Sequence, residues 1–269
     1  SVDLLEYFNN TTSVTETSNA TTSPDGSVSA YKYEGDGSST SIRLFENRSF
    51  SENTTYSLSV FAKAGTNNFL QLGILGVSGS RTVFFDLSTA TASSEFGKIE
   101  NYGNGWYRCS ITADVTTGDL SGNANIYITK SLSETGFDSN SDAQNATMFL
   151  WGAQLETGSY ATSYIPTSGS AVIRSADICN GSGTASDFND SEGVLYANIA
   201  ALADDLTFRV ITLSDSSTSD FVKIGYRHTP NAIYYTIDSG SSNQSFQIYT
   251  ATDVKLSNKV AIKYKSGDI

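Results

Sequence analysis

The sequence predicts an all-β protein built from two antiparallel β-sandwich domains in tandem. Aromatic residues make up 12% of the 269 residues, and long runs of the helix formers Ala, Leu, Glu and Lys are missing from the sequence. Aromatic and β-branched side chains suit the half-buried surface of a pleated sheet. Short alternating segments, separated by polar turns rich in Ser, Thr, Asn and Gly, give the third indication, because this spacing is typical of antiparallel strands.

The first series of strands predicts a jelly-roll sandwich over residues 1–168. In segment 68–76, Leu70, Leu72 and Ile74 share one face, as expected of a strand with one side in a core. In segment 103–115, which opens with a Gly-Asn-Gly turn, Cys109 and Ile111 lie on the apolar face. The predicted strands are 39–45, 55–65, 68–76, 81–87, 103–115, 124–130 and 148–156. Their number and short spacing favour a sandwich or a jelly roll.

The second series predicts another sandwich over residues 169–269. Its predicted strands are 192–202, 206–215, 220–228, 232–238, 245–251 and 259–269. Between the two series, segment 161–170 is rich in Ser and Thr and contains Pro166, which indicates a boundary. Because the last segment has no later strand to pair with, we expect the second sandwich to be incomplete at its C-terminus.

Charge and residue usage exclude several classes of function. The net charge is −12, which argues against a nucleic-acid partner because phosphate binding requires a basic surface. The chain lacks an apolar run of 18 residues, so we expect no membrane insertion. With His228 as its single histidine, the sequence offers neither a Ser-His-Asp triad nor a zinc site. Glu95 and Glu100 would point to opposite faces of a strand, so they do not predict a glycosidase pair.

Two further features leave alternatives open. Asp25, Glu34 and Asp36 lie in a glycine-rich segment, where they predict either a structural Ca²⁺ site or a plain turn. Cys109 is expected to behave as a buried apolar residue, although a disulfide with Cys179 is a second possibility.

The non-core faces of three predicted strands suggest a carbohydrate-binding platform. Aromatic rings stack on the apolar face of a sugar, while neighbouring polar groups bond its hydroxyls. The alternative is that a loop or a neighbouring subunit covers these aromatic residues. Trp151, which shares a strand face with Phe149, Ala153 and Leu155, is predicted to lie in the core. The predicted carbohydrate-binding residues are Phe61, Phe69, Gln71, Trp106 and Arg108.

Several stretches resemble a known class of proteins. The segments FFDLSTATA, NGWYRCSITA and MFLWGAQLETGSYATSYIPTSGSAVIRSAD are similar to a block found in phage tail-fibre and other phage structural proteins. There the block ends a jelly roll similar to carbohydrate-binding modules, and the resemblance covers roughly 4–176. From FNDSEGVLYANIAALADD onward, the chain resembles a laminin-G/concanavalin-like domain that is cut short.

The resemblance implies a structural and recognition role without catalysis, in a homotrimer that belongs to a virion tail or an extracellular structure. Together with the predicted platform, it favours a protein that binds a polysaccharide or a cell-surface glycan. One alternative is a purely structural spacer in a virion or adhesin, with the outward aromatic residues as subunit contacts. Another is an accessory binding fragment of a glycoside hydrolase or polysaccharide lyase. The fold alone does not decide among these functions.

Overall fold

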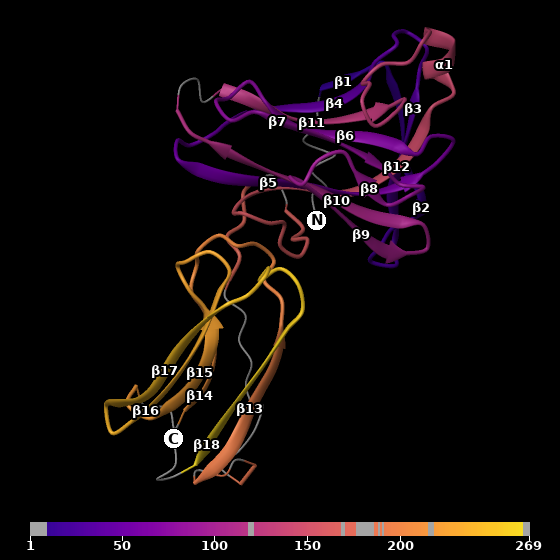
Figure 1. Cartoon of the computed structure of the whole chain (residues 1–269). Helices are drawn as coiled ribbons and strands as arrows, with labels where there is room; N and C mark the ends of the chain where they lie inside the picture. Colours follow the sequence, from indigo (N-terminus) through magenta and orange to yellow (C-terminus); the bar gives the residue numbers. More distant parts are fainter. Residues whose placement is uncertain are drawn as a thin grey trace. The chain divides into compact units, whose positions relative to one another are not determined.

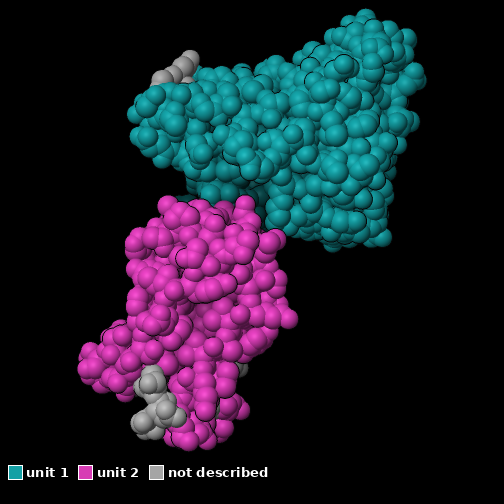
Figure 2. Space-filling view, in the orientation of Figure 1, with its two compact units in different colours: residues 1–174 teal, residues 175–269 magenta. Residues whose placement is uncertain are grey.

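The computed structural model divides the chain into two compact units, residues 1–174 and 175–269, which Figure 2 colours separately. Both consist almost entirely of antiparallel strands, so the predicted all-β class is confirmed. Among the described residues there is one helix, α1 (Asn140–Gln144). The division into two independent domains at 168–169 stays a prediction. The structure describes residues 10–117, 121–167, 170–175, 186–187, 189, 191–214 and 218–265.

Unit 1 contains two six-stranded antiparallel sheets (Figure 1). The first, which we call the β6 sheet, has the order β1 (Asn10–Thr12), β4 (Ile42–Ser49), β11 (Ser121–Thr129), β6 (Phe69–Leu75), β7 (Arg81–Asp86) and β8 (Thr91–Ala92). The second, the β5 sheet, has the order β2 (Val14–Thr22), β3 (Val28–Gly35), β12 (Thr147–Thr157), β5 (Thr54–Ala64), β10 (Trp106–Val115) and β9 (Gly97–Gly103).

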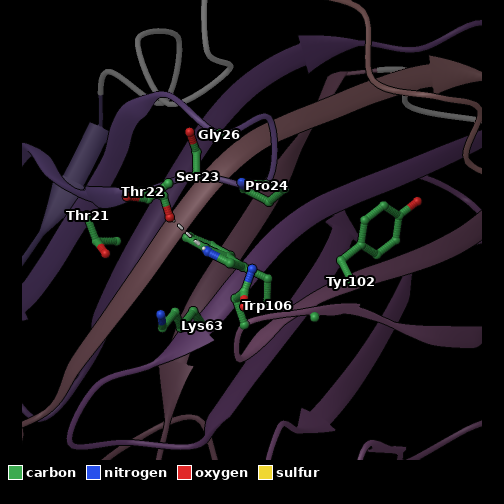
Figure 3. A pocket seen from close by; sticks show the side chains of 10 residues that line it. Thr21, Thr22, Ser23, Pro24, Gly26, Lys63, Tyr102 and Trp106 are labelled. Atoms are coloured by element: carbon green, nitrogen blue, oxygen red, sulfur yellow. Dashed lines mark hydrogen bonds between the residues drawn. The ribbon is translucent and has the colours of Figure 1, made fainter.

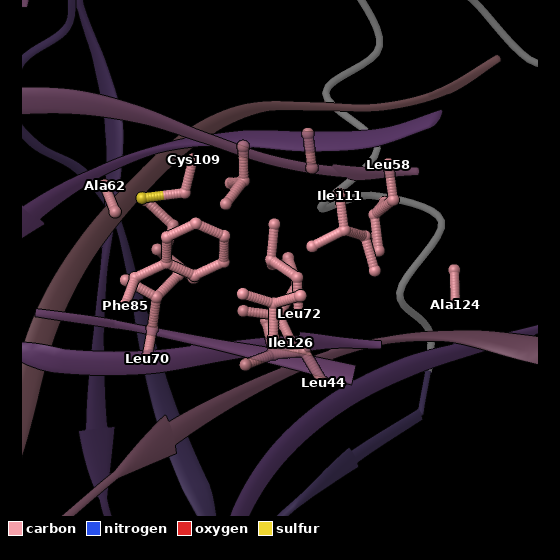
Figure 4. Close-up of a cluster of buried hydrophobic side chains, with 14 of the residues drawn as sticks. Leu44, Leu58, Ala62, Leu70, Leu72, Phe85, Cys109, Ile111, Ala124 and Ile126 are labelled. Atoms are coloured by element: carbon pink, nitrogen blue, oxygen red, sulfur yellow. The ribbon is translucent and has the colours of Figure 1, made fainter. Parts of the chain in front are cut away.

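The main core lies between these two sheets (Figure 4). Leu70 and Leu72 enter it from the β6 sheet, and Leu58 and Ile111 enter it from the β5 sheet; each is at most 1% exposed. Fully burying one such side chain stabilises the fold by about 1.5–3 kcal/mol. The predicted core faces of these strands are therefore confirmed. Alternate residues on the same strands point away from the core, and they form the outer faces of the sandwich.

A β-bulge at Gly152 changes which side chains of β12 face the core. Before the bulge Trp151 pairs with Phe61, whereas after it Leu155 pairs with the core residue Leu58. Gly152 has φ +58°, a left-handed conformation that glycine adopts without steric cost. Trp151 is buried, as predicted, but the extra residue places it in a separate apolar cluster on the outer face and not in the main core with Leu155.

Unit 2 contains two smaller antiparallel sheets (Figure 1). One is a pair of strands, β13 (Glu192–Ile199) and β18 (Asn258–Lys265). The other, which we call the β15 sheet, has the order β14 (Arg209–Ser214), β15 (Phe221–Tyr226), β16 (Ala232–Ser239) and β17 (Ser242–Thr250). Ile224, Ile233 and Ile237 of the β15 sheet pack with Leu195 and Ile262 of the strand pair in one apolar cluster.

Each of the predicted strands has a counterpart within a few residues of its expected bounds. Sequence patterns did not reveal β1, β2, β3, β8 and β9. β3 runs through the segment that was expected to be a glycine-rich loop, and it buries Ala30 and Tyr33 completely. β2 is polar and largely exposed, so it has no apolar alternation to detect.

Two other sequence expectations concern thiols and membranes. Cys109 is fully buried as a free thiol, and burial raises its pKa. Because Cys109 is free, the predicted alternative of a disulfide with Cys179, which lies outside the described residues, is not supported. Over the described part of the chain, no helix is long and apolar enough to cross a membrane.

Candidate functional site

The five residues predicted to form a sugar platform lie on two different surfaces. Phe69 and Gln71 lie on β6, where they alternate with core residues and so belong to the outer face of the β6 sheet. Phe61 lies on β5, and Trp106 and Arg108 lie on β10, which belong to the other sheet. Because the two sheets are stacked with a core between them, their outer faces point in opposite directions. The prediction of a single platform is therefore wrong.

The outer face of the β5 sheet carries a second cluster of buried aromatic residues. Trp106, Phe61 and Trp151 are only 2%, 4% and 6% exposed. The ring of Phe61 lies 5.3 Å from that of Trp151 and 4.9 Å from that of Tyr102, measured between centroids. These side chains form a covered apolar cluster and not an open platform. This agrees with the alternative prediction that a loop or a neighbouring subunit covers the aromatic residues.

The chain segment that leaves β12 supplies part of this cover. In segment 158–165, the ring of Tyr164 packs 4.7 Å from that of Trp151. The backbone N–H of Thr162 donates to the Glu156 carboxylate at 2.9 Å, and its hydroxyl donates to the same carboxylate at 2.6 Å. The segment expected to be a boundary is thus packed against unit 1.

Arg108 is also buried beneath this surface, where it is 3% exposed. Its Nη2 donates to Ser59 Oγ at 3.0 Å, and its guanidinium carbon lies 5.2 Å from the centre of the Phe61 ring. Its Nε has no hydrogen-bond partner among the described residues. In this position the guanidinium supports the aromatic cluster and is not presented to a ligand.

A hollow of about 400 Å³ opens beside the cluster (Figure 3). Tyr102, which is 49% exposed, Lys63 and Asn104 line it. Trp106 lies at its centre in Figure 3, and the indole N–H of Trp106 donates to the carbonyl of Thr22 at 3.0 Å. This bond uses the polar atom of the indole, so Trp106 offers the hollow only an apolar surface.

The outer face of the β6 sheet combines aromatic rings with amide groups and a guanidinium. Strand register aligns Arg43, Tyr127, Gln71 and Phe84 in one row across β4, β11, β6 and β7. The rings of Tyr127 and Phe84 are partly exposed on either side of the buried Gln71. We call this surface the amide–ring face; its members are Arg43, Phe45, Phe69, Gln71, Phe84, Asn123, Asn125 and Tyr127.

Arg43 is held rigidly at one end of the amide–ring face. Its guanidinium carbon lies 3.9 Å from the ring centre of Phe45 and 5.4 Å from that of Tyr127. Its Nε donates to Asn125 Oδ1 at 2.6 Å and its Nη2 donates to Asn123 Oδ1 at 3.3 Å. Among the described residues it forms no ion pair with a carboxylate. Two rings and two amides therefore fix its direction, and its positive charge stays uncompensated.

Gln71 contributes an unsatisfied acceptor to the same face. The residue is 2% exposed, and its Oε1 has no hydrogen-bond partner within the described part of the chain. Leaving a buried acceptor unpaired costs about 1–3 kcal/mol. Its neighbours in the row, Tyr127 and Phe84, are partly exposed rings.

The three carboxylates predicted as a calcium site do not come together. Asp25 accepts the Ser27 backbone N–H at 2.9 Å in the turn before β3, whereas Glu34 pairs with Lys32 at 2.8 Å on β3 itself. Asp36 lies beyond the far end of β3, so about 25 Å of strand separates it from Asp25. No cluster of three metal-binding side chains occurs among the described residues. The expectation of one site from all three is wrong.

The candidates weighed for catalysis are dispersed as well. His228 is exposed in the loop after β15, and its ring lies 5.2 Å from that of Phe208. Glu100 lies on β9 and pairs with Lys98 at 2.8 Å, while Glu95 is exposed outside the strands. The amide–ring face is therefore the candidate site of unit 1, because it brings aromatic rings, amide groups and a guanidinium together. Sequence reasoning found two of its members, Phe69 and Gln71.

Comparison with known proteins adds no assignment. No protein-family model matches the chain, and no curated protein matches it.

Proposed function

We propose that the chain is a carbohydrate-recognition protein without catalytic activity, which binds a polysaccharide or cell-surface glycan on the amide–ring face. Such a face offers both elements of sugar recognition. Partly exposed rings such as Tyr127 can stack on the apolar face of a pyranose. Guanidinium and amide groups such as Arg43 and Asn123 can bond the hydroxyls around its rim.

The arrangement of Arg43 is the observation that carries this proposal. A guanidinium held between the Phe45 and Tyr127 rings has lost its rotamer freedom before any ligand arrives. Binding then costs less conformational entropy than it would with a free side chain. The unsatisfied Gln71 oxygen adds a second reason, because a ligand hydroxyl would supply the missing hydrogen bond.

The setting of the protein follows from the resemblance to phage tail-fibre proteins. We propose a place in a virion tail or a similar extracellular recognition structure, with a homotrimer as its assembled form. An exposed sugar surface binds each glycan weakly, and several copies on one particle would raise the overall avidity. A structural Ca²⁺ ion remains part of the proposal, although it would use no more than a subset of Asp25, Glu34 and Asp36.

The experiment is a glycan-array screen of the full chain with three variants, each run with Ca²⁺ and with a chelator. Tyr127→Ala should weaken binding about tenfold or more, which corresponds to at least 1.4 kcal/mol. Tyr127→Phe keeps the ring and should retain binding. Tyr102→Ala removes an exposed ring from the other sheet, beside the hollow, and should have no effect. Circular dichroism confirms that each variant is folded.

Several results would contradict the proposal. Loss of binding in Tyr102→Ala but not in Tyr127→Ala would move the site to the hollow. If the folded wild-type chain binds no glycan and forms a stable oligomer, the structural spacer becomes the better account. Selective binding to the substrate of a secreted glycoside hydrolase or polysaccharide lyase, with a gene for that enzyme next to this one, would favour the accessory fragment.

A further inference from the structure

The outer face of the β15 sheet in unit 2 carries a row of three aromatic rings. The ring centroid of Phe208 lies 6.3 Å from that of Tyr234, which lies 6.2 Å from that of Phe246. Tyr234 and Phe246 come from β16 and β17, and Phe208 immediately precedes β14. Phe208 and Phe246 are 53% and 43% exposed. The row therefore crosses the sheet on the side that faces away from the apolar cluster of unit 2.

Gly225 explains how the central ring is seated. It pairs with Tyr234 across β15 and β16, and a Cβ placed on Gly225 would lie 3.2 Å from Cε1 of Tyr234. The tyrosine ring lies over the glycine, and a larger residue would be excluded first by the backbone carbonyl of Arg209 and by Val210, which lie closer than the ring. Burial raises the pKa of Tyr234, although the charge of Arg227 opposes the shift, so its hydroxyl stays protonated at neutral pH and can donate.

Cationic side chains lie along the same row. The guanidinium carbon of Arg227 lies 5.7 Å from the ring centre of Tyr234 and 5.3 Å from that of Phe246. The ammonium of Lys223 lies 3.4 Å from the ring centre of Phe221 on the same face. Arg227 and Lys223 form no ion pair within the described residues, and Arg227 Nε is buried there without a partner.

This local charge contrasts with the chain as a whole. The protein has 28 acidic and 16 basic residues, so two cations without an ion-pair partner give this face a local charge opposite in sign to that of the whole chain. Asp238, near the turn between β16 and β17, is a carboxylate on this face. Its oxygens accept bonds from Asn243 at 2.8 Å and Thr236 at 3.4 Å, and so they are already occupied. The middle of the row is positive and apolar at once.

We infer that the ring row of unit 2 is a second binding site, and that its ligand is an acidic polysaccharide whose sugars carry carboxylates. Pyranose rings would stack on Phe208, Tyr234 and Phe246, while a carboxylate would meet the Arg227 guanidinium. A guanidinium matches the two oxygens of a carboxylate and can bind both. This site is separate from the amide–ring face, and either can fail in an experiment without the other.

The geometry of the row favours a polysaccharide over other anionic polymers. Successive rings are rotated by 89° and 49° relative to each other. A chain of pyranoses joined by rotatable bonds can follow such turns. A single-stranded nucleic acid also carries one negative charge for every unit, so competition by an oligonucleotide is measured in the test below. A second copy of this chain docked through the same face would bring the Arg227 and Lys223 cations of both copies together, at considerable cost.

The test measures binding of the full chain to polygalacturonate, with its methyl ester as the uncharged control polymer. Phe246→Ala and Arg227→Met should each weaken binding to polygalacturonate about tenfold or more, equivalent to 1.4 kcal/mol. Two matched variants change the strand pair instead. Tyr196→Ala removes a ring that is 58% exposed on β13, and Lys263→Met removes a charge from β18. Both should bind as the wild type does.

Each other result overturns the inference. Equal binding to the ester would show that the carboxylates are not recognised. Unchanged affinity for polygalacturonate in Phe246→Ala and Arg227→Met would show that the ring row is not part of a binding site. Equal competition by a single-stranded oligonucleotide would indicate a general anion surface. If light scattering shows a wild-type oligomer that Phe246→Ala dissociates, the face is a contact between copies. Binding of neutral glycans that depends on Tyr127 would be unaffected by any of these outcomes.

Discussion

Replacing Gly152 by alanine tests how β12 carries core residues on one side and Trp151 on the other. At φ +58° an alanine Cβ would lie 3.2 Å from Cδ2 of Phe61 and 3.4 Å from the ring of Tyr164. The left-handed backbone conformation costs an L-residue about 1–2 kcal/mol. The contact with Phe61 is tight as well, and it can relax only if the ring moves by a few tenths of an ångström. We therefore expect Gly152→Ala to lower the free energy of unfolding of unit 1 by about 1–2 kcal/mol.

Tryptophan fluorescence isolates unit 1 in this measurement, because both tryptophans of the chain, Trp106 and Trp151, lie in it. Urea slopes for small proteins are about 1–3 kcal/mol per molar. The unfolding midpoint of Gly152→Ala should consequently fall by roughly 0.5–1 M at an intermediate slope. This shift is well outside the reproducibility of a urea titration.

Two glycines provide matched controls. Gly103 has φ +79° with open space around it, so Gly103→Ala measures the backbone cost alone. Gly136 has no left-handed φ, and its nearest neighbour would be 3.6 Å from a Cβ, so Gly136→Ala should be close to neutral. If Gly152→Ala unfolds at the same urea concentration as the wild type, the assignment of a bulge at this position is refuted.

Three other changes have defined outcomes. Trp151→Ala should destabilise unit 1 by about 3–5 kcal/mol. It should also speed proteolysis after Tyr164, because the Tyr164 ring loses its contact with Trp151. If segment 158–165 stays resistant to the protease, this reasoning is contradicted. Arg108→Met should leave stability unchanged or raise it, because a buried guanidinium without a carboxylate partner contributes little; a fall in the urea midpoint of more than about 1 M would count against it. Burial would raise the pKa of Asp86, but hydrogen bonds from Ser88 and Thr89 outweigh it and lower that pKa. The stability from Asp86 is therefore present above the pKa of an unfolded aspartate, about 3.9, and is lost as pH falls through the lower folded value. Asp86→Asn should flatten the acid limb of a stability–pH curve, and an unchanged limb would show that other groups produce it.

The core of the fold could be predicted because apolar and polar residues alternate with a period of two along a strand that buries one face. Segments such as 68–76 place Leu70 and Leu72 on one face, and the structure buries that face completely. β2 gave no such signal, since its side chains are mostly exposed and polar. β3 was missed because Gly and Asp at both of its ends suggested a loop, although Tyr33 at its centre is fully buried.

The candidate site could be predicted only in part, for a different physical reason. Alternation identifies which residues of a strand avoid the core, but it does not tell which sheet the strand joins. Phe61 and Phe69 were therefore assigned to one surface although they lie on opposite sides of the sandwich. Alternation also does not show which segment covers an outer face. Segment 158–165 covers Trp151 through a ring contact from Tyr164, and this contact depends on the tertiary structure. The predicted strands 39–45, 124–130 and 81–87 did contain Arg43, Tyr127 and Phe84, and assigning their outward-facing residues to one surface would have found the rest of the row.

The strand order of unit 1 has a consequence for the time at which it can form during synthesis. β11 lies between β4 and β6, and β12 lies between β3 and β5. Until these two strands leave the ribosome, each sheet exists as two pieces with open edges. Translation adds about 5–20 residues per second, so the earlier strands wait several seconds with unpaired N–H and C=O groups. The nascent chain should need protection from aggregation until Thr157 has emerged, and a chain shortened before β12 should not fold into this sandwich.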